Sequence, residues 1–251
     1  FETIFFDYDN YGFKRTGKYR TKFLLETITQ LKAALEKLNI ALFIYVGQSK
    51  DFLPKLIEQH NIDTIFLQKE WTRDEQLVLE NVKNKISPSI QFKEVYDQFL
   101  FHPDDIPYTS FKSIPDIFTN FRKDCEIHCK VRAPQMPIKA MSKNNLVCTK
   151  TEIPTLNQLG FNDFTQHTHT AFPFQGGEHE AQKRIEQYFW DSQKLTVYKK
   201  TRNGLIGENY SSKLSAWLAN GSISPRTIYW EVRKFEKEIV KNQSTYWLIF
   251  E

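Results

Sequence analysis

The feature that most constrains the fold is an alternation of strand-like and helix-like segments along the first hundred residues. The strand-like runs are rich in β-branched and aromatic residues, and they are Glu2–Tyr8, Ile40–Gly47, Asp63–Gln68 and Ile90–Asp97. Between the first two, apolar residues recur at spacings of three and four from Leu24 to Leu38, which is typical of an amphipathic helix. Such alternation predicts a parallel sheet of four strands with crossover helices.

The pattern changes beyond this α/β region, which we expect to span residues 1–108. Residues 109–175 contain five prolines and little periodicity, so we interpret them as an interdomain linker with one short helix at Pro115–Cys125. Helical periodicity returns at Gly177, and residues 176–251 are expected to be helical, without strands. Because the chain starts on a strand-like run and stops within an apolar helical pattern, we expect it to be a fragment.

Composition excludes some classes of protein. The 251 residues carry a formal net charge of +4. They include only three cysteines, and this low number argues against a secreted disulfide scaffold. No apolar run approaches the ~18 residues of a membrane span. We therefore expect a soluble protein without a membrane span. We also expect it to be intracellular, with no compartment indicated, and monomeric. Cys125, His128 and Cys129 lack a fourth ligand nearby, so no metal site is expected.

Local signals indicate where several helices begin. Thr72–Glu75 has the spacing of a capping box. Ser224-Pro225 combines a hydroxyl cap with a proline at the first helical position. Ser211, Ser212 and Ser215 cluster at the start of a short helical pattern that stops at Asn220-Gly221. Hydroxyls and free amides in such a place suit an anionic pyrophosphate, although ordinary helix capping would explain one serine alone.

The segment Tyr198–Glu238 resembles the flavin-phosphate region of the photolyase/cryptochrome family, most closely its DASH branch. Tyr11–Glu26, Leu100–Tyr108, Phe118–Glu126 and Ser244–Glu251 are similar to other DASH segments, in family order. The resemblance implies a Rossmann-like parallel α/β antenna domain whose first strand–helix unit is missing. The start of an all-helical FAD-binding domain would follow it.

Cofactor residues follow from this resemblance. It implies that Tyr198 lines the FAD site, whereas the residues alone also allow a buried aromatic. It implies further that the FAD phosphates are bound by Ser211, Ser212, Lys213, Leu214 and Ser215. Glu70, after the third expected strand, matches the carboxylate that holds a folate antenna, 5,10-methenyltetrahydrofolate; the alternative is a charge at a helix entry.

DNA contacts are implied in the same way. Arg202 matches an arginine that contacts the DNA backbone, and Lys199 and Lys200 add charge that would neutralise phosphates. The alternative is a solvated charged turn. Glu251 matches the glutamate that hydrogen-bonds a flipped pyrimidine dimer, a role expected only in the full-length protein.

The function implied by the resemblance is light-driven repair of cyclobutane pyrimidine dimers, in single-stranded DNA, by electron transfer from reduced FAD. The full-length protein would then be a deoxyribodipyrimidine photolyase, a carbon–carbon lyase, whereas the 251-residue chain alone is expected to be inactive. One alternative is a blue-light flavoprotein photoreceptor without repair activity. Another is a generic α/β nucleotide-binding module with a helical extension.

Overall fold

The computed structural model of the chain describes residues 1–147 and 151–250 and divides into two compact units. The first unit combines Phe1–Asp97 with Lys139–Phe164, and the second combines Gln98–Ile138 with Thr165–Glu251. Residues 109–175, expected as a linker, thus contribute to both units. None of the helices within the described ranges has the length and apolar character that crossing a bilayer requires.

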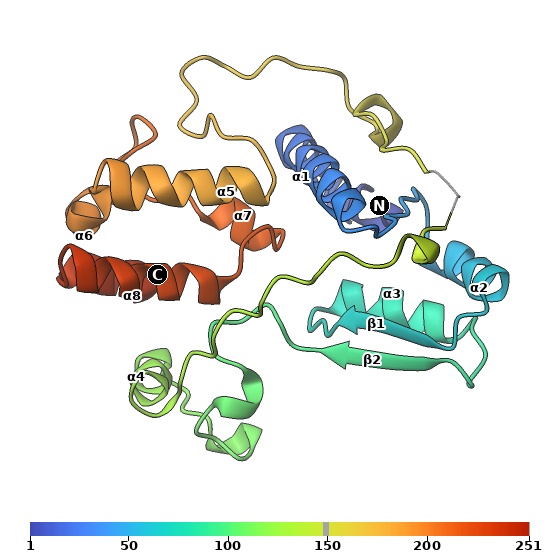
Figure 1. The fold of residues 1–251 in the computed structure, drawn as a ribbon, viewed down its shortest axis with the longest axis horizontal. Coiled ribbons are helices and arrows are strands. Elements are labelled where there is room, and N and C mark those ends of the chain that lie inside the picture. Colours follow the sequence, from blue (N-terminus) through green and yellow to red (C-terminus); the bar gives the residue numbers. More distant parts are fainter. Residues whose placement is uncertain (148–150, 251) are drawn as a thin grey trace. The chain divides into compact units, whose positions relative to one another are not determined.

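The first unit contains a parallel two-stranded sheet (Figure 1). Strand β1 (Thr64–Gln68) pairs in register with β2 (Gln91–Val95), so that Thr64 lies opposite Gln91. The crossover between them is helix α3 (Arg73–Lys83), and α2 (Ser49–His60) packs against it. This arrangement confirms the expected parallel α/β class.

The expectation of four strands is wrong for the described residues of this unit. Within Glu2–Tyr8 a 3-10 helix forms at Thr3–Phe5, and Ile40–Gly47 contributes only a single parallel bridge, between Glu2 and Gly47. Two backbone bonds between Gly47 and the first three residues, 3.0 and 3.1 Å long, hold that bridge. The pairing stops there because the 3-10 turn takes the backbone out of the extended conformation that a ladder requires.

Helix α1 (Lys18–Lys37) and the loops of the first unit are tied to its second stretch by long-range hydrogen bonds. Lys32 Nζ donates to the Thr151 carbonyl at 2.9 Å, and the Thr151 hydroxyl accepts from the Ile44 amide at 2.7 Å. Lys14 Nζ donates to the Gly160 carbonyl at 2.8 Å. Two short 3-10 turns complete this stretch, Lys143–Asn145 and Asn157–Leu159.

The second unit is helical. Its α-helices are α4 (Phe118–His128), α5 (Glu178–Ile185), α6 (Tyr198–Thr201), α7 (Ser215–Ala219), α8 (Pro225–Glu238) and α9 (Gln243–Phe250). Its other helical turns are the 3-10 segments Pro103–Asp105, Phe111–Ser113 and Lys194–Val197, and a π-helical turn at Glu186–Asp191. No strand occurs among the described residues from 177 onward, as expected.

The core of the second unit forms around α8. Ser224 caps this helix by accepting from the Arg226 amide at 3.2 Å, which confirms the start predicted from Ser224-Pro225. Val232 and Phe235 are fully buried on its apolar face. Trp190, from the π-helical turn, packs edge-on against Phe235 at 5.4 Å and donates its indole N–H to Glu231 at 2.8 Å. These contacts fix the π-helical turn against α8.

Candidate functional site

The serine-rich segment lies at the end of a loop, residues 202–214, that connects α6 to α7. Ser212 and Leu214 are buried, and Ser215 is exposed as the first residue of α7. Lys213 has a φ of +62°, a left-handed conformation that is rare for a residue other than glycine. The backbone therefore reverses at Lys213, immediately before the helix begins.

Hydrogen-bond donors in this segment are uncommitted. Within the described residues, the hydroxyls of Ser211, Ser212 and Ser215 take part in no hydrogen bond, and neither do the backbone amides of Ser212 and Lys213. Such a group of hydroxyls and amides can receive a phosphate, which offers many acceptor oxygens. The Lys213 ammonium adds positive charge and lies 3.5 Å from the centroid of the Tyr210 ring.

A buried arginine lies behind this loop. Arg184, in α5, is 2% exposed, and its Nε donates to the Ser212 carbonyl at 3.0 Å. Its Nη2 donates to the carbonyls of Glu208 and Ser211, both at 3.0 Å. Its Nη1 donates to the side-chain oxygen of Asn209 at 2.9 Å. Four hydrogen bonds from one guanidinium thus hold four residues of the loop.

Sequence analysis did not select Arg184, although a signal was present. Ala181, Ile185 and Tyr188 form the apolar face of the helical pattern that begins after Gly177. Arg184 follows Ala181 by three residues and precedes Tyr188 by four, so it lies on that same face. A charged residue on a buried face requires polar partners, and the Glu208–Ser212 loop supplies them.

The basic residues expected to bind DNA lie on α6 and just after it. Tyr198, the first residue of α6, is buried, and Lys200 is exposed. The Lys199 ammonium and the Arg202 guanidinium lie 5.4 and 5.0 Å from the centroid of the Trp247 ring in α9. The structure thus brings two of the three expected cations together around an indole that the sequence analysis did not select.

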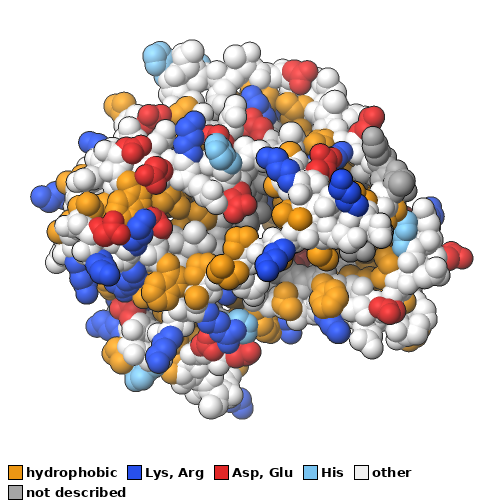
Figure 2. All heavy atoms as spheres, viewed as in Figure 1, with side chains coloured by type: hydrophobic (Ala, Val, Ile, Leu, Met, Phe, Trp, Pro, Cys, Tyr) orange, Lys and Arg blue, Asp and Glu red, His pale blue; other side chains and the backbone are white. Residues whose placement is uncertain are grey.

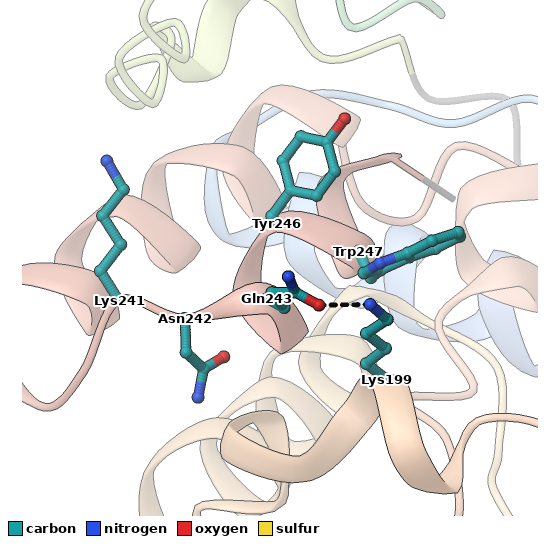
Figure 3. A pocket seen from close by; sticks show the side chains of 6 residues that line it. All are labelled: Lys199, Lys241, Asn242, Gln243, Tyr246 and Trp247. Atoms are coloured by element: carbon teal, nitrogen blue, oxygen red, sulfur yellow. Dashed lines mark hydrogen bonds between the residues drawn. The ribbon is translucent and has the colours of Figure 1, made fainter.

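A shallow pocket of about 500 Å³ opens beside this cluster. The residues that line it are Lys199, Lys241, Asn242, Gln243, Tyr246 and Trp247 (Figure 3). Lys199 is hydrogen-bonded to the Gln243 side chain, and both approach Trp247, whereas the Lys241 ammonium points away from them. Over the visible face in Figure 2, basic and acidic side chains are interspersed.

Asn242 fixes the helix that carries Trp247. Its side-chain oxygen accepts from the amides of Ser244 and Thr245, at 2.7 and 3.2 Å, and so caps α9. Its side-chain nitrogen donates to the Thr196 carbonyl at 3.0 Å. The Ser244 hydroxyl accepts from the Lys199 amide at 3.1 Å. These bonds fasten α9 to the residues that carry the basic cluster.

Glu70 belongs to the first unit and lies just after β1. It is half-buried, and its carboxylate accepts from the Gln68 side chain at 2.8 Å. Next to it, Trp71 and Tyr96 stack with ring centroids 5.2 Å apart and planes 21° apart. Glu70 and this stacked pair follow the carboxyl ends of the parallel strands, where α/β proteins bind ligands. Glu251 lies outside the described residues.

The described residues contain no group of three or more His, Cys, Asp or Glu that could hold a metal ion. Burial raises the pKa of Cys125 to about 12 and also raises the pKa of Cys129.

The DNA photolyase family model matches residues 3–139, which is more than half of the chain. The chain belongs to the DNA photolyase family. Among curated relatives, the cryptochrome DASH of Danio rerio is 36% identical over 244 residues, covering 96% of this chain and 47% of the relative. The cryptochrome DASH of Xenopus laevis is 38% identical over 244 residues, covering 96% of this chain and 46% of the relative. These matches confirm the expected resemblance to DASH-type cryptochromes.

Solved structures of the family agree with this assignment. The crystal structure of a Synechocystis cryptochrome matches with a TM-score of 0.90 and 35% identity, covering 100% of this chain and 52% of that one. A class III photolyase from Agrobacterium tumefaciens shares the fold, with a TM-score of 0.73 at 17% identity, covering 93% of this chain and 48% of that one. The chain spans about half the length of the relatives it matches.

Proposed function

We propose that this member of the DNA photolyase family binds FAD at the Ser211–Ser215 segment and repairs cyclobutane pyrimidine dimers in light. The observation that carries the proposal is the group of three serine hydroxyls and two backbone amides without a partner among the described residues, next to the left-handed turn at Lys213. When bound, reduced FAD would supply the electron that light transfers to the dimer.

The chemistry of the donor set fits a dinucleotide phosphate. Hydroxyls and amides donate to phosphate oxygens without carrying charge, and Lys213 adds one ammonium within the segment. Leu214 is buried and anchors the turn, so the serines on either side of it are held in place. Tyr198 is proposed to line the same site from α6.

The basic cluster suits a single strand of DNA. Lys199, Lys200 and Arg202 would bind phosphates, while the indole of Trp247 offers a face on which an unpaired base can stack. A dimer in single-stranded DNA is cheaper to extrude than one in a duplex. Glu251 is proposed as the contact to the extruded dimer.

A folate antenna is proposed at the edge of the two-stranded sheet. Glu70 would accept hydrogen bonds from the amino-pyrimidine edge of 5,10-methenyltetrahydrofolate, and the stacked pair Trp71 and Tyr96 would lie beside its ring. The site belongs to the first unit, and the proposed FAD segment to the second.

The FAD assignment is tested by replacing Ser211, Ser212 and Ser215 with alanine together in the full-length natural protein. Flavin occupancy after purification, measured by absorbance, should fall, because hydrogen bonds to a charged group contribute ~1.5–3 kcal/mol each. The control is the double replacement of the exposed Ser87 and Ser89, which should leave occupancy unchanged. Unchanged occupancy in the triple variant would show that the phosphates bind elsewhere.

The repair activity is tested separately, by comparing lit and dark samples of the full-length protein with dimer-containing single-stranded DNA. Light-dependent loss of the dimer is expected. A protein that retains FAD but repairs neither single-stranded nor duplex DNA would instead act as a blue-light photoreceptor.

A further inference from the structure

We propose that Arg184 is the positioning residue of the anion-binding segment: it draws the carbonyls of the Glu208–Ser212 loop inward, so that the loop's amides face the cofactor phosphates. The inference rests on the proposed FAD function and assigns a role to a residue that would not touch the cofactor itself. It follows from the direction of the peptide groups, the backbone conformation at Lys213 and the charge balance around the guanidinium.

The direction of the peptide groups carries the first step. In a trans peptide the C=O and N–H bonds point to opposite sides, and no cis peptide occurs among the described residues. Because Arg184 collects the carbonyls of Glu208, Ser211 and Ser212, the amides of the following residues point away from it. Those of Ser212 and Lys213 are uncommitted and lie beside the serine hydroxyls.

The backbone conformation supports the same orientation. Lys213 is left-handed, with φ +62°, and Leu214 is right-handed, with φ −74° and ψ −14°. Successive residues of opposite handedness bring their amides toward one point and create a concavity that binds anions. A left-handed lysine is strained, so it requires a restraint, and the bond from Arg184 to the Ser212 carbonyl fixes the preceding peptide.

The charge around Arg184 points in the same direction. Within the described residues no carboxylate lies at ion-pair distance from it, although Glu208 attracts it from farther away. The guanidinium lies 4.6 Å from the centroid of the Phe174 ring and 4.9 Å from that of Tyr188. Burial lowers the pKa of Arg184, but arginine keeps its charge in proteins. A buried positive charge without a carboxylate at ion-pair distance favours an anion on the far side of the loop.

A role confined to stability would have a different signature. If Arg184 only held the unit together, its loss would weaken every flavin alike, through a smaller folded population. If it orients the amides toward phosphate, its loss should weaken FAD and spare riboflavin, which has no phosphate. The ratio of the two affinities therefore separates positioning from stability.

The experiment uses apoprotein of the full-length natural chain, titrated with FAD and with riboflavin by fluorescence quenching. Arg184→Lys keeps the charge but lacks the planar guanidinium, whose nitrogens reach three backbone carbonyls and the side-chain oxygen of Asn209. It should weaken FAD binding about tenfold or more and leave riboflavin binding within about twofold. Equal losses for both flavins, or unchanged FAD affinity, would overturn the proposal.

A second variant keeps the proposal testable if Arg184→Lys does not fold. Asn209 is exposed and contributes only its side-chain oxygen, so Asn209→Ala removes one of the four bonds and leaves the core intact. A loss of FAD affinity of about threefold is expected, with riboflavin unchanged. The control is Asn203→Ala, an exposed asparagine in the same loop that makes no hydrogen bond to Arg184. Equal FAD affinity in the Asn209 and Asn203 variants would contradict the proposal.

Failure of this inference differs from failure of the proposed function. If the unmodified protein binds FAD no more tightly than riboflavin, phosphate recognition is absent and both proposals fall. If it prefers FAD, and the triple serine variant loses that preference while Arg184→Lys keeps it, the FAD site stands and the role of Arg184 is refuted.

Discussion

Replacing Asn242 with alanine should release the N-terminus of α9 from the residues around the basic cluster. The change removes an N-cap worth ~0.5–2 kcal/mol and a hydrogen bond to the Thr196 carbonyl worth ~0.5–1.5 kcal/mol. Together these should lower the local opening free energy of α9 by about 1–3.5 kcal/mol, which raises its opening constant roughly 5- to 400-fold.

Native-state hydrogen exchange of the α9 amides in the full-length protein measures this opening. Asn242→Asp is the matched control, because it keeps an oxygen that can cap Ser244 and Thr245 and loses only the donor to Thr196. A carboxylate is also favourable at a helix N-terminus. Exchange in the aspartate variant should therefore lie close to that of the unmodified protein, with the alanine variant well above both.

Two results would refute the reasoning about Asn242. If the aspartate and alanine variants exchange equally fast, the side-chain oxygen does not cap α9. If neither variant changes the exchange of α9, then packing alone holds that helix, and the geometry around Trp247 does not depend on Asn242.

Three further predictions concern the proposed partners. Arg202→Ala in the full-length protein should leave FAD in place, weaken DNA binding and lower the slope of log K against log salt by ~1; Lys183→Ala, an equal change of charge on α5, should not alter that slope. Glu70→Gln should reduce folate absorbance in the purified full-length protein without reducing FAD, and equal folate occupancy would exclude Glu70 as the antenna ligand. The isolated 251-residue chain should be poorly soluble, because Trp230, Ile239 and Tyr246 remain about two-fifths exposed. After refolding with excess FAD and desalting it should retain little flavin. Stoichiometric retention of flavin would contradict this prediction.

Local signals in the sequence predicted local structure well. The start of α8 was predicted from Ser224-Pro225, since a cap and a proline act on the adjacent turn alone. At α3 the start was also predicted correctly, but the capping box was not, because the Thr72 side chain makes no cap hydrogen bond. The spacing of residue types fixes where a helix can begin but not which rotamer its cap adopts.

Features that depend on distant partners could not be predicted in the same way. Glu2–Tyr8 and Ile40–Gly47 have the composition of strands, yet a strand exists only where a neighbour continues its ladder. Trp247 meets Lys199 and Arg202 across more than 40 residues, and no local pattern indicates that contact. The serine segment could be selected because its residues lie close together in the sequence, and its role stays a prediction. Arg184 could not be selected in this way, because it bonds to the segment from another helix.

The π-helical turn at Glu186–Asp191 makes the length of this segment as important as its composition. In an α-helix, three consecutive residues spread over roughly 200°, but here Tyr188 and Phe189 are both buried and Trp190 still reaches Glu231. The wider turn accommodates one more residue than an α-helical turn would. Deleting Gln187 should remove the extra residue and let α5 continue as an ordinary helix, with Trp190 on nearly the same face as before. Adding a residue should instead rotate Trp190 by about 100° and take it away from Glu231, so we expect this stretch to accept many substitutions on its exposed side but no insertion.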